Sequence, residues 1–182
     1  MEIDEQALTR RLGELTASVN GQSQTLSHQL GVLVGAAVEL LGVDAVGVLL
    51  LDEADRIRTA AVTAPSASAL ETAQERLLLG PGVDVQRLRR VVTVSDLAED
   101  PAYRQLWDEV ADAGVRGVLS APVWVGHEVV GNLNAITARV HEWSDAERRA
   151  GAAYASLVAQ LLVAATRAAR RADTERTERT DR

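Results

Sequence analysis

Two adjacent apolar runs constrain the fold of this chain more than any other feature. Residues 118–125 and 129–137 are rich in β-branched and small side chains, and Gly126-His127-Glu128 separates them. Short apolar runs joined by such a turn are typical of an antiparallel β-hairpin. Residues 46–51 and 57–63 flank the acidic segment Asp52-Glu53-Ala54-Asp55 in the same way, so the sequence predicts two hairpins.

Helical patterns fill the segments around these hairpins. Near the N-terminus, apolar residues recur at helical spacing at Leu8, Leu12, Leu15 and Val19. A second helix is expected from about residue 25 to Gly42, and a short strand at residues 91–94. Ser68-x-x-Glu71 and Ser144-x-x-Glu147 match the capping box, and Asp100-Pro101 joins a cap to a first-turn proline. Helices are therefore expected at about 69–78, from 100 to 113 and from 144 onward, which makes the fold class α+β.

Four segments between residues 80 and 147 resemble the GAF domain family. They are the Gly80-Pro81-Gly82-Val83 bend before the 91–94 strand, the strand ending in Pro122-Val123, the Gly131-Asn132-Leu133-Asn134 strand, and the Trp143-Ser144-x-x-Glu147 start of the last helix. Trp143 stands where the family usually has Phe. The resemblance covers about residues 23–163 and implies a GAF-like antiparallel sheet flanked by helices. We accordingly divide the chain into an N-terminal helix at 1–22, a GAF-like domain at 23–166 and a polar, disordered tail at 167–182.

Composition excludes several functions. The net charge of −7 argues against a nucleic-acid-binding surface, because phosphate contacts need clustered basic residues. Cys, Lys and Phe are absent from the sequence. In GAF-like proteins, Cys carries bilin attachment and methionine sulfoxide reduction, while Lys and Phe belong to the cyclic-nucleotide signature. The resemblance therefore implies none of these activities for this chain.

No cofactor or metal is expected. His28, His127 and His141 are not spaced as neighbouring metal ligands, and capping or solvent exposure explains them better than haem ligation. The N-terminus does not resemble a signal peptide, and no apolar run approaches the roughly 20 residues that span a bilayer. We therefore expect a cytoplasmic protein that contacts neither membrane nor nucleic acid.

Six residues are candidates for contact with a small ligand. Asn132 and Asn134 share one face of a strand, which should point toward the 100–113 helix, while Leu133 points the other way. Hydrogen bonding of the two Asn side chains to buried groups is an equally good explanation. The full set of candidates is Tyr103, Trp107, Arg116, Ser120, Asn132 and Asn134. Tyr103 and Trp107 lie one helical turn apart and suit either an aromatic wall or core packing, and Arg116 could pin a loop carboxylate.

The sequence favours a non-catalytic sensory or regulatory domain. No phosphate loop, nucleophile elbow or zinc-hydrolase motif is present. We expect an unknown small molecule, or a signalling protein acting in trans, to bias the packing of the terminal helices in a homodimer. Leu8, Leu12, Leu15 and Val19 would pair in a bundle with Tyr154, Leu157, Leu161 and Ala164. The alternative is a ligand-free GAF dimerisation scaffold; a haem-based sensor or an enzyme fits the sequence less well.

Overall fold

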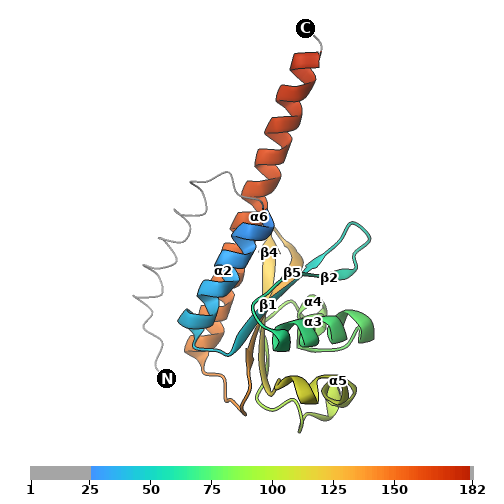
Figure 1. The fold of residues 1–182 in the computed structure, drawn as a ribbon, viewed down its shortest axis with the longest axis vertical. Coiled ribbons are helices and arrows are strands. Elements are labelled where there is room, and N and C mark those ends of the chain that lie inside the picture. The colour runs from blue at the N-terminus through green and yellow to red at the C-terminus, as the bar shows by residue number, and fades with distance from the viewer. Residues whose placement is uncertain (1–25, 181–182) are drawn as a thin grey trace.

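A five-stranded antiparallel sheet forms the centre of the molecule. The computed structural model describes residues 26–180, and Figure 1 shows the sheet between two groups of helices. The spatial order is β2-β1-β5-β4-β3, and every neighbouring pair is antiparallel. The strands are β1 (Ala45–Leu51), β2 (Ile57–Val62), β3 (Val92–Val94), β4 (Gly117–Val125) and β5 (Glu128–Thr137). Both predicted hairpins are present, and the α+β fold class is confirmed.

Helices cover both faces of the sheet. On one face lie the two long helices, α2 (Leu26–Leu41) and α6 (Asp145–Thr180), side by side (Figure 1). On the other face lie α3 (Pro65–Leu77) and α4 (Pro81–Leu88). The short elements η1 (Pro101–Tyr103), α5 (Arg104–Val110) and η2 (Ala111–Ala113) follow one another and pack against α3. The 100–113 segment therefore lies beside α3, and it is α3 and α4 that cover the part of the sheet that carries Asn132 and Asn134.

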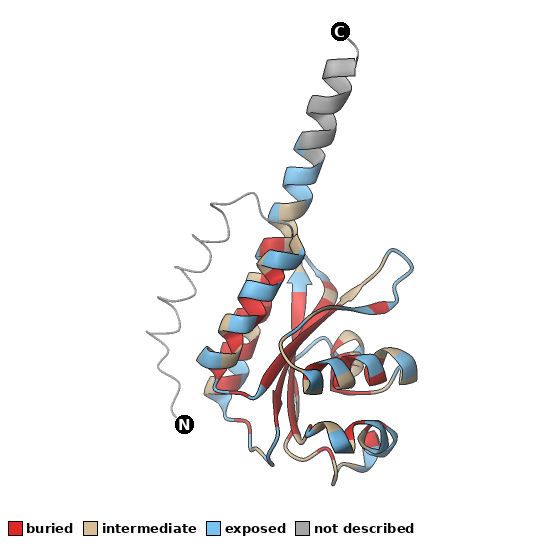
Figure 2. Ribbon diagram, viewed as in Figure 1, coloured by how far each residue is buried: buried red, intermediate tan, exposed pale blue. Residues whose placement is uncertain are grey.

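Side-chain alternation along β5 divides the core between the two faces. Leu133 and Ala135 pack with α2 and α6 in the larger apolar cluster, whereas Ile136 joins a second cluster beneath α3 and α5. Asn132 and Asn134 share the face of Ile136, because side chains alternate along a strand. All of these residues are buried, and Figure 2 shows the central strands mostly in the buried colour, whereas β2 is mostly intermediate or exposed. The centre of the sheet is thus apolar on one face and polar on the other.

The two Ser-x-x-Glu motifs have different structures. Ser144 and Glu147 form a capping box at the start of α6: the Ser144 hydroxyl and backbone N–H both donate to Glu147 at 2.7 Å. Ser68 does not cap a helix, because α3 already begins at Pro65, with Ala64 as N-cap. Proline is favoured in the first helical turn, where its missing N–H has no partner to lose. The prediction of a capping box at Ser68 and Glu71 was therefore wrong, and Glu71 lies well inside α3.

Helix α6 is longer than the sequence suggested. It continues to Thr180, whereas we expected residues 167–182 to form a disordered tail. Ala, Arg and Glu are strong helix formers, and extending an existing helix avoids the cost of nucleation. Within α6, residues 145–169 are long and apolar enough to cross a membrane by length and composition. About 28% of this apolar stretch is buried in the protein, including Tyr154, Val158 and Leu161 of the core cluster.

The predicted helix–helix seam is partly used inside the domain. Tyr154 and Leu161 are buried in the core between α6 and the sheet, so they are not free to pair with another chain. Leu157 is half-buried and Ala164 is exposed. The N-terminal helix expected at 1–22, with Leu8, Leu12, Leu15 and Val19, lies outside the described residues.

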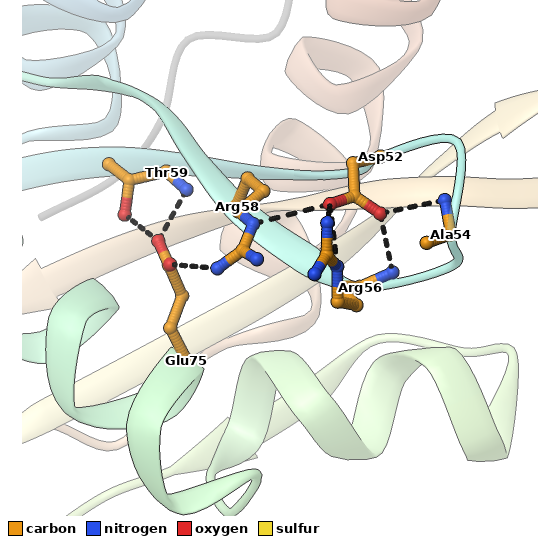
Figure 3. A network of polar contacts seen from close by, with 6 residues as sticks. All are labelled: Asp52, Ala54, Arg56, Arg58, Thr59 and Glu75. Atoms are coloured by element: carbon orange, nitrogen blue, oxygen red, sulfur yellow. Dashed lines mark hydrogen bonds and ion pairs between the residues drawn. The ribbon is translucent and has the colours of Figure 1, made fainter.

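A polar network fastens α3 to the edge of the sheet (Figure 3). Glu75 of α3 accepts hydrogen bonds from the Thr59 backbone N–H and hydroxyl, both at 2.5 Å, and lies 3.4 Å from the Arg58 guanidinium. Asp52 in the β1–β2 turn binds Arg58 and Arg56 at 3.3 and 2.9 Å. These pairs are largely exposed, so each ion pair adds little stability. Glu75 nevertheless satisfies a backbone N–H on the outer edge of β2, which fixes where α3 lies.

The two Ser-x-x-Glu motifs provide a matched pair of variants. Ser144→Ala should lower the free energy of unfolding by about 1 kcal/mol, because it removes a helix cap. Ser68→Ala should change it by no more than a few tenths of a kcal/mol, because Ser68 is exposed inside a helix. Urea denaturation measures both. An equal or larger loss for Ser68→Ala would mean that α3 starts at Ser68 rather than at Pro65.

Candidate functional site

Five buried polar side chains meet between the sheet and α3. We call them the Glu71 cluster; they are Glu71 and Gln74 of α3, Ser120 of β4, and Asn132 and Asn134 of β5. Each has 0% of its surface exposed. Polar groups are buried at a cost unless they are hydrogen-bonded, so a cluster of this size at the centre of a sheet demands explanation.

Asn134 is the centre of the cluster, and its neighbours fix the direction of its amide. Its Oδ1 accepts hydrogen bonds from the Ser120 hydroxyl and from Asn132 Nδ2, the latter at 2.9 Å. The amide nitrogen must therefore point away from the strand, toward α3. There it donates to both carboxyl oxygens of Glu71 at 2.8 Å. The sheet thus presents one oriented N–H donor group, the Asn134 amide, and the Glu71 carboxyl group accepts its hydrogen bonds.

A glycine in β1 makes room for Glu71. Asn134 has a register partner on each neighbouring strand. Gly47 is opposite Asn134 on β1, and Ser120 is opposite Asn134 on β4. A Cβ at position 47 would overlap the Glu71 carboxyl group. The missing side chain therefore leaves the space through which Glu71 reaches Asn134.

Glu71 is a buried carboxyl group without a counter-charge. Desolvation raises its pKa to about 8, and the hydrogen bonds from Asn134 and Gln74 only partly oppose this rise. Glu75, one turn further along α3, raises the pKa slightly more. No positively charged side chain in the described part of the chain contributes to this pKa. Glu71 is therefore mostly protonated at neutral pH.

Helix α4 closes the cluster from the side. The Gly82 backbone N–H donates to Gln74 Oε1 at 2.8 Å, and Gln74 Nε2 donates to Glu71 at 2.9 Å. A Cβ at position 82 would lie 2.7 Å from Asn132 Nδ2, so glycine allows α4 to approach β5 closely. Asn132 Oδ1, by contrast, is buried without a hydrogen-bond partner. Orphaned buried acceptors are uncommon in native structures.

The other three candidate residues form a separate group around α5. Tyr103 is buried and donates its hydroxyl to Asp84 of α4 at 2.7 Å. The Arg116 guanidinium binds Asp96 through two hydrogen bonds, at 2.7 and 2.5 Å, and lies over the Trp107 ring at 5.5 Å from its centroid. Arg116 thus pins a loop carboxylate, as the sequence suggested. This pair holds the pKa of Asp96 below its usual range through the Arg116 hydrogen bonds.

The structure therefore brings together half of the predicted site. Ser120, Asn132 and Asn134 meet in the Glu71 cluster, whereas Tyr103, Trp107 and Arg116 tie α5 to its surroundings. Sequence reasoning missed Glu71 and Gln74, because Glu71 was assigned to a capping box. The signal that could have found them is Pro65: a helix starting there puts Ala67, Leu70, Glu71 and Gln74 on one face.

An open groove of about 780 Å³ runs along the outer side of α3. Small side chains and the Arg76–Glu109 ion pair line it. It shares no lining residue with the Glu71 cluster, so the two features are separate.

An antiparallel sheet with helices on both faces is an α+β architecture. The sequence profile of the GAF domain matches residues 23–163, and the chain belongs to this family. GAF domains serve as sensory and regulatory modules in signalling proteins. A comparison with curated proteins finds no match.

Solved structures with the same fold come from different kinds of protein. Two are GAF domains of phosphoenolpyruvate-protein phosphotransferases, from Acinetobacter (16% identity, 91% of this chain and 96% of that chain, TM-score 0.69) and from Coxiella burnetii (20%, 91% and 98%, TM-score 0.69). A third is the free methionine-R-sulfoxide reductase of Neisseria meningitidis, in complex with its substrate (16%, 92% and 96%, TM-score 0.69). At these identities the likeness shows the fold alone.

The stability of the fold should depend on pH through Glu71. In the unfolded chain this carboxyl group ionises near its ordinary pKa of 4.5, whereas in the native state it keeps its proton up to about 8. The free energy of unfolding should therefore fall by on the order of 5 kcal/mol between pH 4.5 and 8 and level off above. The pKa values of Asp96 and Glu147 are lowered, so these two groups change the free energy of unfolding only below this pH window.

Urea denaturation across this pH range measures the effect, with Glu71→Gln and Glu75→Gln as matched variants on one helix. Glu71→Gln should remove the fall, and Glu75→Gln should keep it. The same slope in wild type and Glu71→Gln would show that Glu71 is not a buried acid.

Gly47 supplies a second test of the cluster. Gly47→Ala should destabilise the protein by about 1–3 kcal/mol, because its Cβ overlaps Glu71. Gly31→Ala in α2 is the control: no atom lies within 4 Å of the added Cβ, and alanine favours the helix, so stability should be unchanged or higher. Thermal unfolding compares the two. Equal effects would mean that Glu71 does not fill the space above Gly47.

Proposed function

We propose that this chain is a non-catalytic sensory domain of the cytoplasm. In this proposal, a small molecule or a partner protein binds on the α3–α4 side of the sheet, and the signal leaves through α2 and α6 in a homodimer. The main support is the Glu71 cluster, a buried polar site whose side chains are hydrogen-bonded to one another. Neither membrane nor nucleic acid takes part in this mechanism.

The two faces of β5 supply a route for coupling. Asn132 and Asn134 belong to the cluster, and Leu133 between them packs against the α2–α6 layer. A ligand that shifts the two Asn side chains therefore moves the strand on which that layer rests. Coupling of this kind needs only that the ligand bind one arrangement of the helices better than the other.

An enzymatic role has less support. One structural neighbour is a methionine sulfoxide reductase, but this sequence contains no Cys with which to carry out redox chemistry. The carboxyl group of the cluster is bound by the amides of Gln74 and Asn134 rather than directed at an open space. A ligand-free dimerisation scaffold is the competing function, and it predicts that nothing small binds the cluster.

The exposed end of α6 offers a test of the dimer. Val163 of α6 is half-buried and is not part of the apolar core cluster. Wild type should sediment as a dimer at tens of micromolar, and Val163→Glu should weaken the dimer at least about tenfold, or about 1.4 kcal/mol. Val140→Glu, at an exposed position in the connection before α6, should have no effect.

Analytical ultracentrifugation gives the oligomeric state, and native mass spectrometry of protein purified from its own host tests for a retained small molecule. A bound mass together with a dimer supports the sensor. A clean dimer without any bound mass supports the scaffold instead, and a wild-type monomer contradicts dimer signalling altogether.

A further inference from the structure

The hydrogen-bond inventory of the Glu71 cluster is unbalanced. With Glu71 ionised, every donor atom of the cluster has a partner: Asn134 Nδ2 and Gln74 Nε2 bind Glu71, while Asn132 Nδ2 and the Ser120 hydroxyl bind Asn134. The acceptors are not all matched. Asn132 Oδ1 has no partner, and Glu71 has no cation beside it in the described residues. In its ionised form the cluster therefore lacks donors and positive charge, whereas in the protonated form the Glu71 O–H itself supplies one donor.

We infer that the Glu71 cluster is a binding site for a small organic cation with N–H donors, such as a primary amine, amidine or guanidine. The cation donates to the Glu71 carboxylate and to Asn132 Oδ1, and thus supplies both missing components. This inference names the ligand class of the proposed sensor and rests on that proposed function.

Other ligand classes fit the inventory less well. An anion would have to lie beside a buried carboxyl group, and no positively charged side chain contributes to the environment of that group. A neutral ligand would leave the ionised carboxylate without a counter-charge. A hard metal ion takes about six or more oxygen ligands, and the described residues contain no group of three or more acidic or metal-binding side chains.

The way in is between α4 and β5. Asn132 lies beneath Gly82, and the bond from Gly82 N–H to Gln74 ties α4 to the cluster. The linker before α4 contains two positive-φ residues, Leu78 (φ 51°) and Gly80 (φ 147°), so its conformation differs from that of a continuous helix. In this inference α4, a helix of eight residues, moves about this linker and so uncovers Asn132 and then Glu71.

Binding must be coupled to proton release. Burial keeps the pKa of Glu71 at about 8, and an organic cation binds the ionised form. The apparent affinity is reduced by the fraction of Glu71 that is protonated, so it should be about 20-fold weaker at pH 6.5 than at pH 8.5. Of the charged groups on the surrounding elements, only Glu75 acts on this pKa. The others on α3, on α4 and on the elements packed against α3 are Arg58, Arg76, Asp84, Arg87, Arg104, Asp108, Glu109, Asp112 and Glu128.

The experiment uses the full chain and methylguanidinium chloride as the probe, with N-methylurea as the neutral control and sodium acetate as the anionic control, at constant ionic strength. Two-dimensional ¹H–¹⁵N NMR follows the backbone amide of Gly82 and the side-chain amides of Asn132 and Asn134. Calorimetry in two buffers of different ionisation enthalpy measures protons released. Glu71→Gln tests the site, and Glu75→Gln is the matched variant outside it.

The inference predicts saturable shifts with methylguanidinium alone, release of close to one proton per bound probe near pH 7, and at least about tenfold weaker binding by Glu71→Gln but not by Glu75→Gln. The proton release is measured on wild type, so it stands even if Glu71→Gln folds poorly. Equal binding of N-methylurea or acetate, or shifts from none of the three probes, overturns the ligand class. The sensor itself fails only if the protein from its host also carries no bound molecule.

Discussion

The bond between Asn134 and Glu71 is the interaction on which the rest of the structure depends. Ser120 and Asn132 orient the Asn134 amide, and that amide then fixes the carboxyl group of α3 against the centre of the sheet. Removing either Asn134 or Glu71 would leave the other buried side chain without its hydrogen bond. The free-energy cost of such an unpaired buried group exceeds the net contribution of the hydrogen bond itself. The positions of α3 and α4 are therefore coupled to two side chains of β5.

This arrangement gives the two faces of the sheet different tasks. Apolar side chains of β1, β4 and β5 bind the sheet to α2 and α6, and their burial supplies most of the stability. The opposite face buries a polar cluster in place of apolar side chains, and one acceptor of this cluster, Asn132 Oδ1, has no hydrogen-bond partner. Natural proteins depart from an apolar core at functional sites more often than elsewhere, and this contrast is what points to binding. Because side chains alternate along β5, any change in the cluster is next to the helix-packing face.

Much of the fold could be predicted from the sequence, because its signals are local. The hairpin turn at Gly126, the alternation through Asn132 and Asn134, and the cap at Ser144 each need only a few neighbouring residues to be recognised. The cluster itself could be predicted only in part. Glu71 has the same local pattern as a capping residue, and its burial depends on Pro65 and on the absence of a side chain at Gly47, which is 24 positions away in the chain. Likewise, Arg116 and Trp107 pair with each other, a contact set by tertiary packing rather than by spacing.

The central claim is that Glu71 is a buried acid held by Asn134, and a direct titration tests it. The ¹³Cδ resonance of Glu71, assigned by its absence in Glu71→Gln, reports ionisation of this carboxyl group alone. The structure predicts a midpoint near pH 8, because burial without a counter-charge disfavours the carboxylate. A midpoint at or below the ordinary 4.5 would contradict it, since it would mean that the side chain is either exposed to water or paired with a cation.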